Sequence, residues 1–269
     1  MRPTLEKYGK VFDVGLQNTF VYRWNFLLRS LFALAPLAGT VLIWQAIFSE
    51  SGSVGSYGYH QMIWYFLLVL LVDNLVTPTE DEWQIAADIR DGQMNAYLVK
   101  PFNYIAYRFS LFLSYRLIYT LVTLLPVAAI FFWFREVIVW PSDWTTWPVF
   151  GLSVALSAAL SFLIAYCVAL MAFWVLEIST LLFIVYSFEY FLSGQTFPLD
   201  IMPLWFQNVL MFTPFPYQMF FPVQIVMERV AGEALWRGLA IQTAWVAAVF
   251  ALSQFLWSRG VRKYQAYGG

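Results

Sequence analysis

The chain has 269 residues, of which 61% are hydrophobic and 20% aromatic, whereas only 12% are charged. Soluble domains are roughly half apolar and one quarter charged, so this composition predicts an integral membrane protein. A formal net charge of −1 gives no support for a nucleic-acid partner. The single cysteine, Cys167, excludes a disulfide within the chain and a cysteine-based metal cluster.

Residues 1–29 carry basic and aromatic side chains that suit a segment lying along lipid headgroups. Their helical pattern is mixed, because Phe12 and Leu16 share one side while Val11 and Val14 share another. An interfacial helix and a simple polar tail both remain open. No signal-peptide cleavage pattern follows, so the first apolar run is expected to stay in the mature protein.

Six stretches are long and apolar enough to cross a hydrocarbon core about 30 Å thick, which takes about 20 helical residues. They lie near 30–48, 61–77, 109–134, 149–175, 178–197 and 236–257. The run 149–197 is too long for one crossing and is expected to fold back at residues 177–180. The sequence therefore predicts an all-α integral membrane protein with six transmembrane helices in a single domain, residues 1–269.

Most of the 15 lysines and arginines flank one side of these spans. Cytoplasmic flanks of membrane helices accumulate basic residues, so both termini are expected in the cytoplasm. The loop 78–104, between the second and third spans, is then cytoplasmic as well. The segment 198–235, between the last two spans, is external.

The loop 78–104 contains a polar helix, predicted over residues 80–91. Thr79 and Glu82 form a capping-box pattern, and Gly92 suits the left-handed residue that ends a helix. At 100° per residue, one face collects Glu80, Asp81, Gln84, Asp88 and Asp91. Such a face suits either solvent or a protein partner, and the surrounding membrane spans favour the partner.

A charged residue inside a span is a candidate functional residue, because a charge is costly in lipid. Glu189 lies close to the middle of the fifth span, and it and Tyr186 are candidate pathway residues; a structural, hydrogen-bonded carboxyl is the alternative for Glu189. Asp73 and Arg116 lie near the cytoplasmic ends of neighbouring spans. An ion pair between them is predicted, with snorkelling to the headgroups as the alternative for Arg116.

The external segment 198–235 is apolar and aromatic but broken by prolines, so it cannot form one spanning helix. A re-entrant hairpin that acts as a movable gate is one interpretation, and an amphipathic loop lying on the outer surface is the other. The candidate gate residues are Phe197, Pro198, Trp205, Phe215 and Pro216.

Two motifs on the expected sides of this topology resemble those of a known family. The cytoplasmic loop reads Ile-Arg-Asp-Gly-Gln-Met-Asn-Ala-Tyr-Leu-Val-Lys-Pro over residues 89–101, and the external segment opens with Ser-Gly-Gln-Thr-Phe-Pro over residues 193–198. Nearly the whole chain resembles the permease subunits of bacterial type-2 ABC exporters.

The resemblance implies a pore of two permeases, this chain and a second identical or paralogous one, above two copies of an ABC ATPase subunit in the bacterial cytoplasmic membrane. ATP and magnesium would bind the ATPase, and this chain would bind no cofactor. The cytoplasmic helix would couple the two parts. The implied ATPase-coupling residues are Glu80, Asp81, Gln84, Asp88, Arg90, Asp91, Gly92, Lys100 and Pro101.

The residues themselves argue against an enzyme. Gly9-Lys10 is followed by Val11, and no phosphate-binding glycine loop occurs, so ATP hydrolysis is expected in a partner. His60 is the only histidine, which leaves no histidine-based metal site or Ser-His hydrolase. The expected function is export of a hydrophobic or amphipathic molecule. A membrane anchor or sensor without transport is the alternative, and a membrane enzyme is a more distant one.

Overall fold

The computed structural model describes residues 2–21, 23–32, 34–78 and 81–264. Regular structure in these residues is helical, apart from one isolated antiparallel bridge between Val54 and Tyr57. The four long apolar helices are α4 (Tyr59–Val76), α7 (Tyr104–Trp133), α8 (Thr146–Leu170) and α12 (Gly232–Lys263). Their length and composition suffice to cross a membrane, which confirms the predicted helical membrane class.

Two of the six predicted spans are shorter than expected. Helix α3 (Leu34–Glu50) has 17 residues and α9 (Ser179–Leu192) has 14. At about 1.5 Å per residue these helices measure about 26 Å and 21 Å, less than a core of about 30 Å. The number of six spans therefore stays a prediction.

The N-terminal segment is helical rather than a polar tail. It forms α1 (Arg2–Phe20) and α2 (Arg23–Phe32), and α1 packs along α7. Helices α1 and α7 approach closely because Gly15 of α1 has no side chain; a Cβ there would overlap the side chain of Ser114 of α7. The backbone N–H of Asn103 also donates to the hydroxyl of Tyr8 at 3.0 Å.

The chain folds back between α8 and α9, as the sequence predicts. The turn η2 (Met171–Phe173) ends α8, and α9 begins at Ser179. The carboxylate of Glu177 accepts a hydrogen bond from the backbone N–H of Ser179 at 3.0 Å. This bond holds the first turn of α9 and holds the pKa of Glu177 below its usual range.

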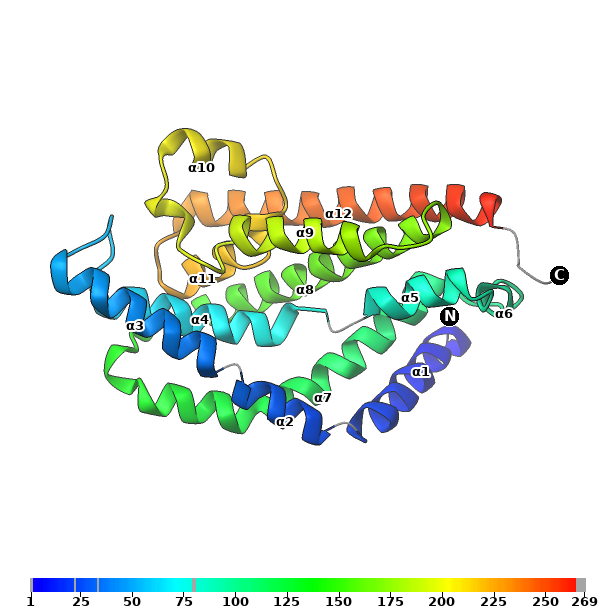
Figure 1. Ribbon diagram of the computed structural model, residues 1–269, viewed down its shortest axis with the longest axis horizontal. Coiled ribbons are helices and arrows are strands. Elements are labelled where there is room, and N and C mark those ends of the chain that lie inside the picture. Colours follow the sequence, from blue (N-terminus) through cyan, green and yellow to red (C-terminus); the bar gives the residue numbers. More distant parts are fainter. Residues whose placement is uncertain (1, 22, 33, 79–80, 265–269) are drawn as a thin grey trace.

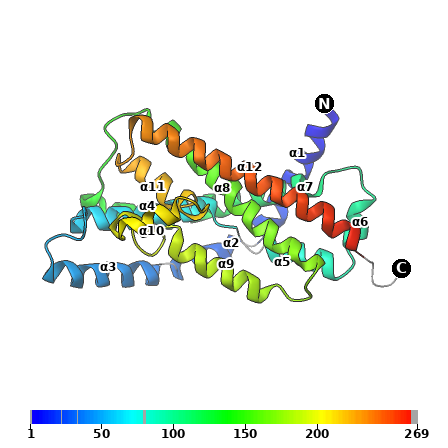
Figure 2. The ribbon, with the colours of Figure 1, turned by 90° about the horizontal axis from the view of Figure 1, so that it is seen from above.

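The bundle has two distinct ends (Figure 1). At the α5/α6 end lie α5 (Asp81–Arg90), α6 (Met94–Leu98), the start of α1 and the end of α12. At the opposite α10 end lie the loop 51–58, η1 (Arg135–Val137) and α10 (Leu204–Leu210). Figure 2 shows the same separation from above, with α3 and α10 far from α6.

The segment after α9 leaves and re-enters the bundle. It contains η3 (Leu199–Ile201), α10, η4 (Phe215–Tyr217) and α11 (Phe220–Val226). The backbone N–H of Phe220 donates to the carbonyl of Ser193 at 2.9 Å, and Gln218 donates to Ser161 at 3.1 Å. Ser161 lies well inside α8, so residues 215–220 reach the middle of the bundle. Their carbonyls find donors there, since Gln242 of α12 donates to the carbonyl of Tyr217 at 2.9 Å.

Candidate functional site

Helix α5 is positioned by the turn at which it ends and by its buried contacts with the core and with α9. It ends at Arg90, and Gly92 has φ = 78°, which confirms the predicted left-handed stop. Thr79 and Glu80, the predicted cap and first residue, lie outside the described residues. Ile85 and Ile89 are buried against the core, and Ala86 packs with Ile178 and Leu182 at the start of α9.

Only part of the predicted acidic face is exposed. Asp81 and Asp88 are only 7% and 6% exposed, whereas Gln84 and Asp91 are exposed to solvent. The helical periodicity groups these residues, but α5 is turned so that part of the face packs onto α7, α8 and α9. The exposed edge instead carries Trp83, Gln84, Arg90 and Asp91.

Asp88 is buried because Arg108 of α7 neutralises it. The two side chains form an ion pair, and both are more than 90% buried. The hydroxyl of Tyr104 donates to the same carboxylate at 2.6 Å and accepts from Arg108 Nε at 2.9 Å. Arg108 also donates to the side-chain and backbone oxygens of Gln84 at 3.3 Å and 3.4 Å. This Asp88–Arg108–Tyr104 cluster joins α5 rigidly to the base of α7.

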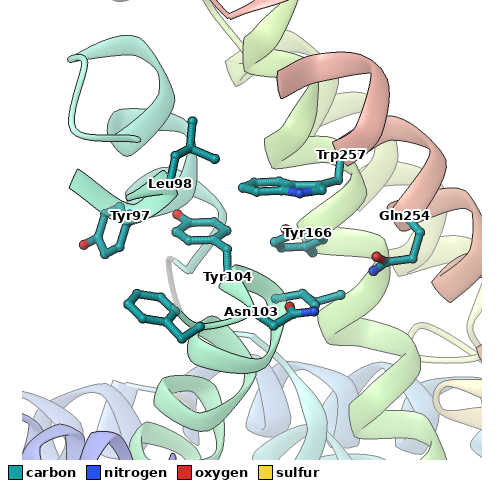
Figure 3. A pocket seen from close by; sticks show the side chains of 9 residues that line it. Tyr97, Leu98, Asn103, Tyr104, Tyr166, Gln254 and Trp257 are labelled. Carbon is teal, nitrogen blue, oxygen red and sulfur yellow. The ribbon is translucent and has the colours of Figure 1, made fainter. Parts of the chain in front are cut away.

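Sequence reasoning counted Arg108 only as a flanking positive charge and did not single out Tyr104. A signal was present, because an arginine close to the start of a long apolar span is costly without a partner. Tyr104 stacks on Trp257 of α12, with ring centroids 5.2 Å apart and an interplanar angle of 12°. The cluster therefore reaches a third helix, α12, which is the second membrane helix that it contacts (Figure 3).

The remaining coupling-motif residues lie at the surface. Lys100 and Pro101 are exposed after α6, and the Lys100 ammonium lies 5.4 Å from the centre of the Tyr97 ring. Burial raises the pKa of Tyr97 to about 12, so its hydroxyl stays protonated at physiological pH. Arg90 and Asp91 form an exposed ion pair at 3.0 Å. Their side chains are free to meet another surface.

Asp73 and Arg116 do not form the predicted ion pair within the described residues. Asp73 accepts from Thr77 at 2.6 Å and from Gln195 at 3.1 Å. Arg116 instead donates to the backbone carbonyl of Asn74 at 2.9 Å. In a regular helix that carbonyl would accept from residue 78, but Pro78 has no N–H. Arg116 thus satisfies a carbonyl that the proline leaves without its helical partner.

The two candidate pathway residues, Tyr186 and Glu189, are half-buried on α9. Gln218 of the returning segment donates to Glu189 at 2.9 Å, and the hydroxyl of Tyr186 faces Glu82 of α5. Glu189 therefore has a hydrogen-bond partner, as its structural alternative expects. Its role in a pathway stays a prediction.

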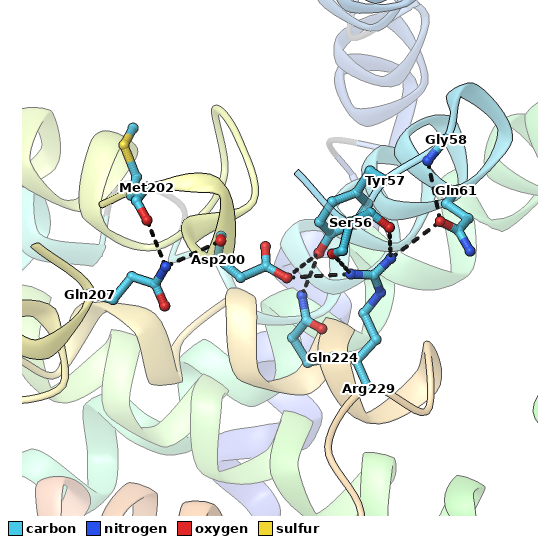
Figure 4. Close-up of polar contacts among 9 residues, drawn as sticks. All are labelled: Ser56, Tyr57, Gly58, Gln61, Asp200, Met202, Gln207, Gln224 and Arg229. Atoms are coloured by element: carbon cyan, nitrogen blue, oxygen red, sulfur yellow. Dashed lines mark hydrogen bonds and ion pairs between the residues drawn. The ribbon is translucent and has the colours of Figure 1, made fainter. Parts of the chain in front are cut away.

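A polar cluster closes the α10 end, and sequence reasoning did not predict it (Figure 4). The Arg229 guanidinium lies 3.7 Å from the centre of the Tyr57 ring and donates to Ser56 Oγ at 2.6 Å. The Tyr57 hydroxyl donates to Asp200 at 3.0 Å and accepts from Gln224 at 2.9 Å. This Tyr57–Asp200–Arg229 cluster joins the loop 51–58 to both arms of the re-entering segment.

Burial raises the pKa of Asp200, and the hydrogen bond from Tyr57 and the charge of Arg229 oppose that rise.

A second contact at this end joins the loop after α7 to the end of α11. The exposed carboxylate of Glu228 accepts from the backbone N–H and hydroxyl of Ser142, both at 2.8 Å, and the hydroxyl contact lowers the pKa of Glu228.

The predicted gate residues differ in their burial. Pro198 and Pro216 are buried, Phe197 and Phe215 are half-buried, and Trp205 is 68% exposed on α10. The exposed apolar residues of α10 agree with a loop that lies on the outer surface. The return of residues 215–220 to the middle of the bundle agrees with a re-entrant hairpin. The gate function itself stays a prediction.

We expect the Arg229→Gln variant to loosen the α10 end. Hydrogen bonds to a charged group contribute about 1.5–3 kcal/mol, so local opening of the loop 51–58 should increase about tenfold or more. Hydrogen exchange of the Val54 and Tyr57 amides, which bond each other's carbonyls at 3.0 Å and 3.1 Å, measures this opening. Arg237→Gln removes an exposed charge nearby and is the control. Unchanged exchange in Arg229→Gln would contradict the role given to this cluster.

These features define a multi-pass helical membrane protein with a structured loop at one end and a re-entering segment at the other. Residues 34–268 match a protein family described as ABC-2 family transporter protein. The chain belongs to this family and is a membrane permease rather than an enzyme. No curated protein matches it.

Proposed function

We propose that this permease is the membrane subunit of an ATP-driven exporter, works with a separate ABC ATPase, and moves a hydrophobic or amphipathic molecule outward. One observation carries the proposal: α5 is fixed to α7 by the buried ion pair of Asp88, while the edge that carries Trp83 and Arg90 is exposed. A helix held in this way can pass a force from a docked partner to the membrane helices.

The exposed edge of α5 has the character of a docking site. Trp83 is 45% exposed beside Gln84, Arg90 and Asp91. Aromatic and arginine side chains dominate the binding energy of protein interfaces. We propose that two ATPase subunits, which would bind the ATP and magnesium, each hold one such helix.

The proposed orientation places the α5/α6 end in the cytoplasm of a bacterial cell. Lys100 follows α6, and Arg259, Arg262 and Lys263 belong to the last part of α12; both elements end at that side of the bundle, in accordance with the bias of basic residues towards the cytoplasm. A second permease is proposed to cover α9, whose exposed side carries Phe183, Ile184, Phe188 and Phe191. That partner is identical or paralogous.

The test is to purify the tagged chain from its native membranes in mild detergent and to assay the ATPase that accompanies it. The double variant Trp83→Ala/Arg90→Ala should retain at least about tenfold less ATPase, a loss of about 1.4 kcal/mol or more in affinity. Trp236→Ala/Arg237→Ala removes a similar exposed pair at the α10 end and should retain it fully.

Two results would overturn the proposal. Full ATPase recovery with Trp83→Ala/Arg90→Ala would place docking elsewhere. A wild-type chain that brings no ATPase would favour an anchor or sensor, or a membrane enzyme.

A further inference from the structure

Glu189 of α9 and Gln218 of the re-entering segment meet in the middle of the bundle. Gln218 Nε2 donates to Glu189 Oε1 at 2.9 Å and to Ser161 Oγ at 3.1 Å. Ser161 lies well inside α8, a helix that is long and apolar enough to cross a membrane. These two bonds therefore hold the Glu189 carboxyl group at the depth of the apolar core.

The amide group of Gln218 lacks one of its hydrogen bonds. Gln218 is 1% exposed, and its Oε1 atom has no hydrogen-bond partner among the described residues. Burying a carbonyl oxygen without a partner is costly, and most buried polar atoms in proteins have one. An amide oxygen only accepts hydrogen bonds, so the missing partner of Gln218 Oε1 is a donor.

The charged groups around Glu189 disfavour its ionised form. Asp73 of α4 and Glu82 of α5 lie close enough to repel its charge, and the Tyr186 hydroxyl faces Glu82. The charge of Arg116 of α7 acts on Asp73. In the part of the chain that the structure describes, Glu189 forms no salt bridge. A carboxylate without a cation is costly at this depth, and a bound proton removes its charge.

One proton satisfies both groups. A carboxylic acid and an amide pair through two hydrogen bonds, in which the amide N–H donates to the acid and the acid O–H donates to the amide oxygen. The first of these bonds is present at 2.9 Å. We infer that Glu189 and Gln218 form a proton-binding site, in which a proton from water binds Glu189 Oε2 and is donated to Gln218 Oε1.

The site links proton binding to the attachment of the re-entering segment. When the proton leaves, the Glu189 carboxylate faces the Gln218 oxygen, and two acceptors repel each other. Residues 218–220 then separate more easily from α9, where the backbone N–H of Phe220 donates to the Ser193 carbonyl at 2.9 Å. The proton stabilises the protein at low pH, and this contribution is lost as the pH rises and Glu189 ionises. Neither the ATPase nor the substrate of the proposed function is required.

The first test detects the proton itself in the purified full chain, with any subunits that accompany it. An ordinary glutamate has a pKa of about 4.3, so it carries almost no proton at about pH 6. Infrared spectra at that pH should contain the carbonyl band of a protonated carboxylic acid, and Glu189→Gln should reduce its intensity. The control is Glu50→Gln, which removes an exposed carboxylate at the end of α3 and should leave the band unchanged.

The second test follows hydrogen exchange of the Phe220 amide from about pH 5 to about pH 9, corrected for the intrinsic exchange rate. Exchange in the wild type should increase about tenfold with pH, because the bond to Gln218 Oε1 is lost. Glu189→Gln supplies an N–H at every pH, so its exchange should stay at the low-pH rate of the wild type. Glu50→Gln should behave as the wild type.

Three results would overturn the site. One is a carboxylic acid band of equal intensity in the wild type and Glu189→Gln. Another is Phe220 exchange that does not depend on pH in the wild type, a measurement that needs no variant to fold. The third is exchange that responds to sodium at constant pH and not to pH, which would replace the proton by a metal cation.

Discussion

Replacing Arg108 with methionine is expected to destabilise the protein by about 3–5 kcal/mol, the largest effect of any single substitution proposed for this chain. The substitution leaves the Asp88 carboxylate buried without its cation. When α5 packs onto α7, this charge is then removed from water with no ion pair to compensate. Thermal unfolding in detergent and the yield of folded protein from membranes measure the loss. We expect a smaller loss in the free energy of ATPase docking than in the free energy of unfolding, because the substitution leaves the exposed edge of α5 unchanged.

Two further variants distinguish the effect of breaking the buried ion pair from the effect of removing a positive charge elsewhere. Adding Asp88→Leu to Arg108→Met removes both charges and should recover a large part of the lost stability, since a buried pair contributes little beyond an apolar replacement. Arg90→Met breaks the pair with Asp91, whose side chains are 52% and 46% exposed, and should cost at most about 1 kcal/mol. Similar losses for Arg90→Met and Arg108→Met would contradict the role given to the cluster.

Gly194→Ala is expected to produce the second large loss, about 2–4 kcal/mol, and to open the re-entering segment. Gly194 has φ = 90°, a conformation that side chains rarely adopt. A Cβ there would also lie 2.7 Å from the Tyr65 hydroxyl and 2.9 Å from Phe220 Cβ. Either strain or overpacking costs on the order of 1–3 kcal/mol.

Unfolding temperature and hydrogen exchange of the Phe220 amide, which bonds the Ser193 carbonyl, measure this effect. Gly151→Ala is the control, because a Cβ on this α8 residue meets nothing within 4 Å. It should be neutral or slightly stabilising, since alanine favours helix. A Gly194→Ala protein as stable as the wild type would show that the segment shifts without cost.

Much of the fold follows from local sequence. Long apolar runs predict α4, α7, α8 and α12, because hydropathy and helical rise alone decide whether a segment can cross a membrane. Gly92 and the polar turn at Glu177 mark real ends and turns, since each depends on the conformation of a few adjacent residues. The prolines after Phe197 correctly predict short, broken helices.

The site depended on contacts that no local pattern contains. Periodicity grouped the carboxylates of α5 on one face, but it could not show that Arg108, 20 residues later, would bury Asp88. Similarly, Arg116 donates to the carbonyl of Asn74 near the end of α4, where Pro78, just beyond the helix, has no N–H to offer.

The sequence by itself determined that this protein is a helical membrane protein with a structured polar loop, because membrane crossing and helix ends are set by composition and near neighbours. Only the tertiary structure decided which charges are buried, which edge of α5 is exposed, and that Gln218 returns to the middle of the bundle. The physical reason is that each buried polar group needs a partner, and the crossing of distant helices determines which partner lies within reach.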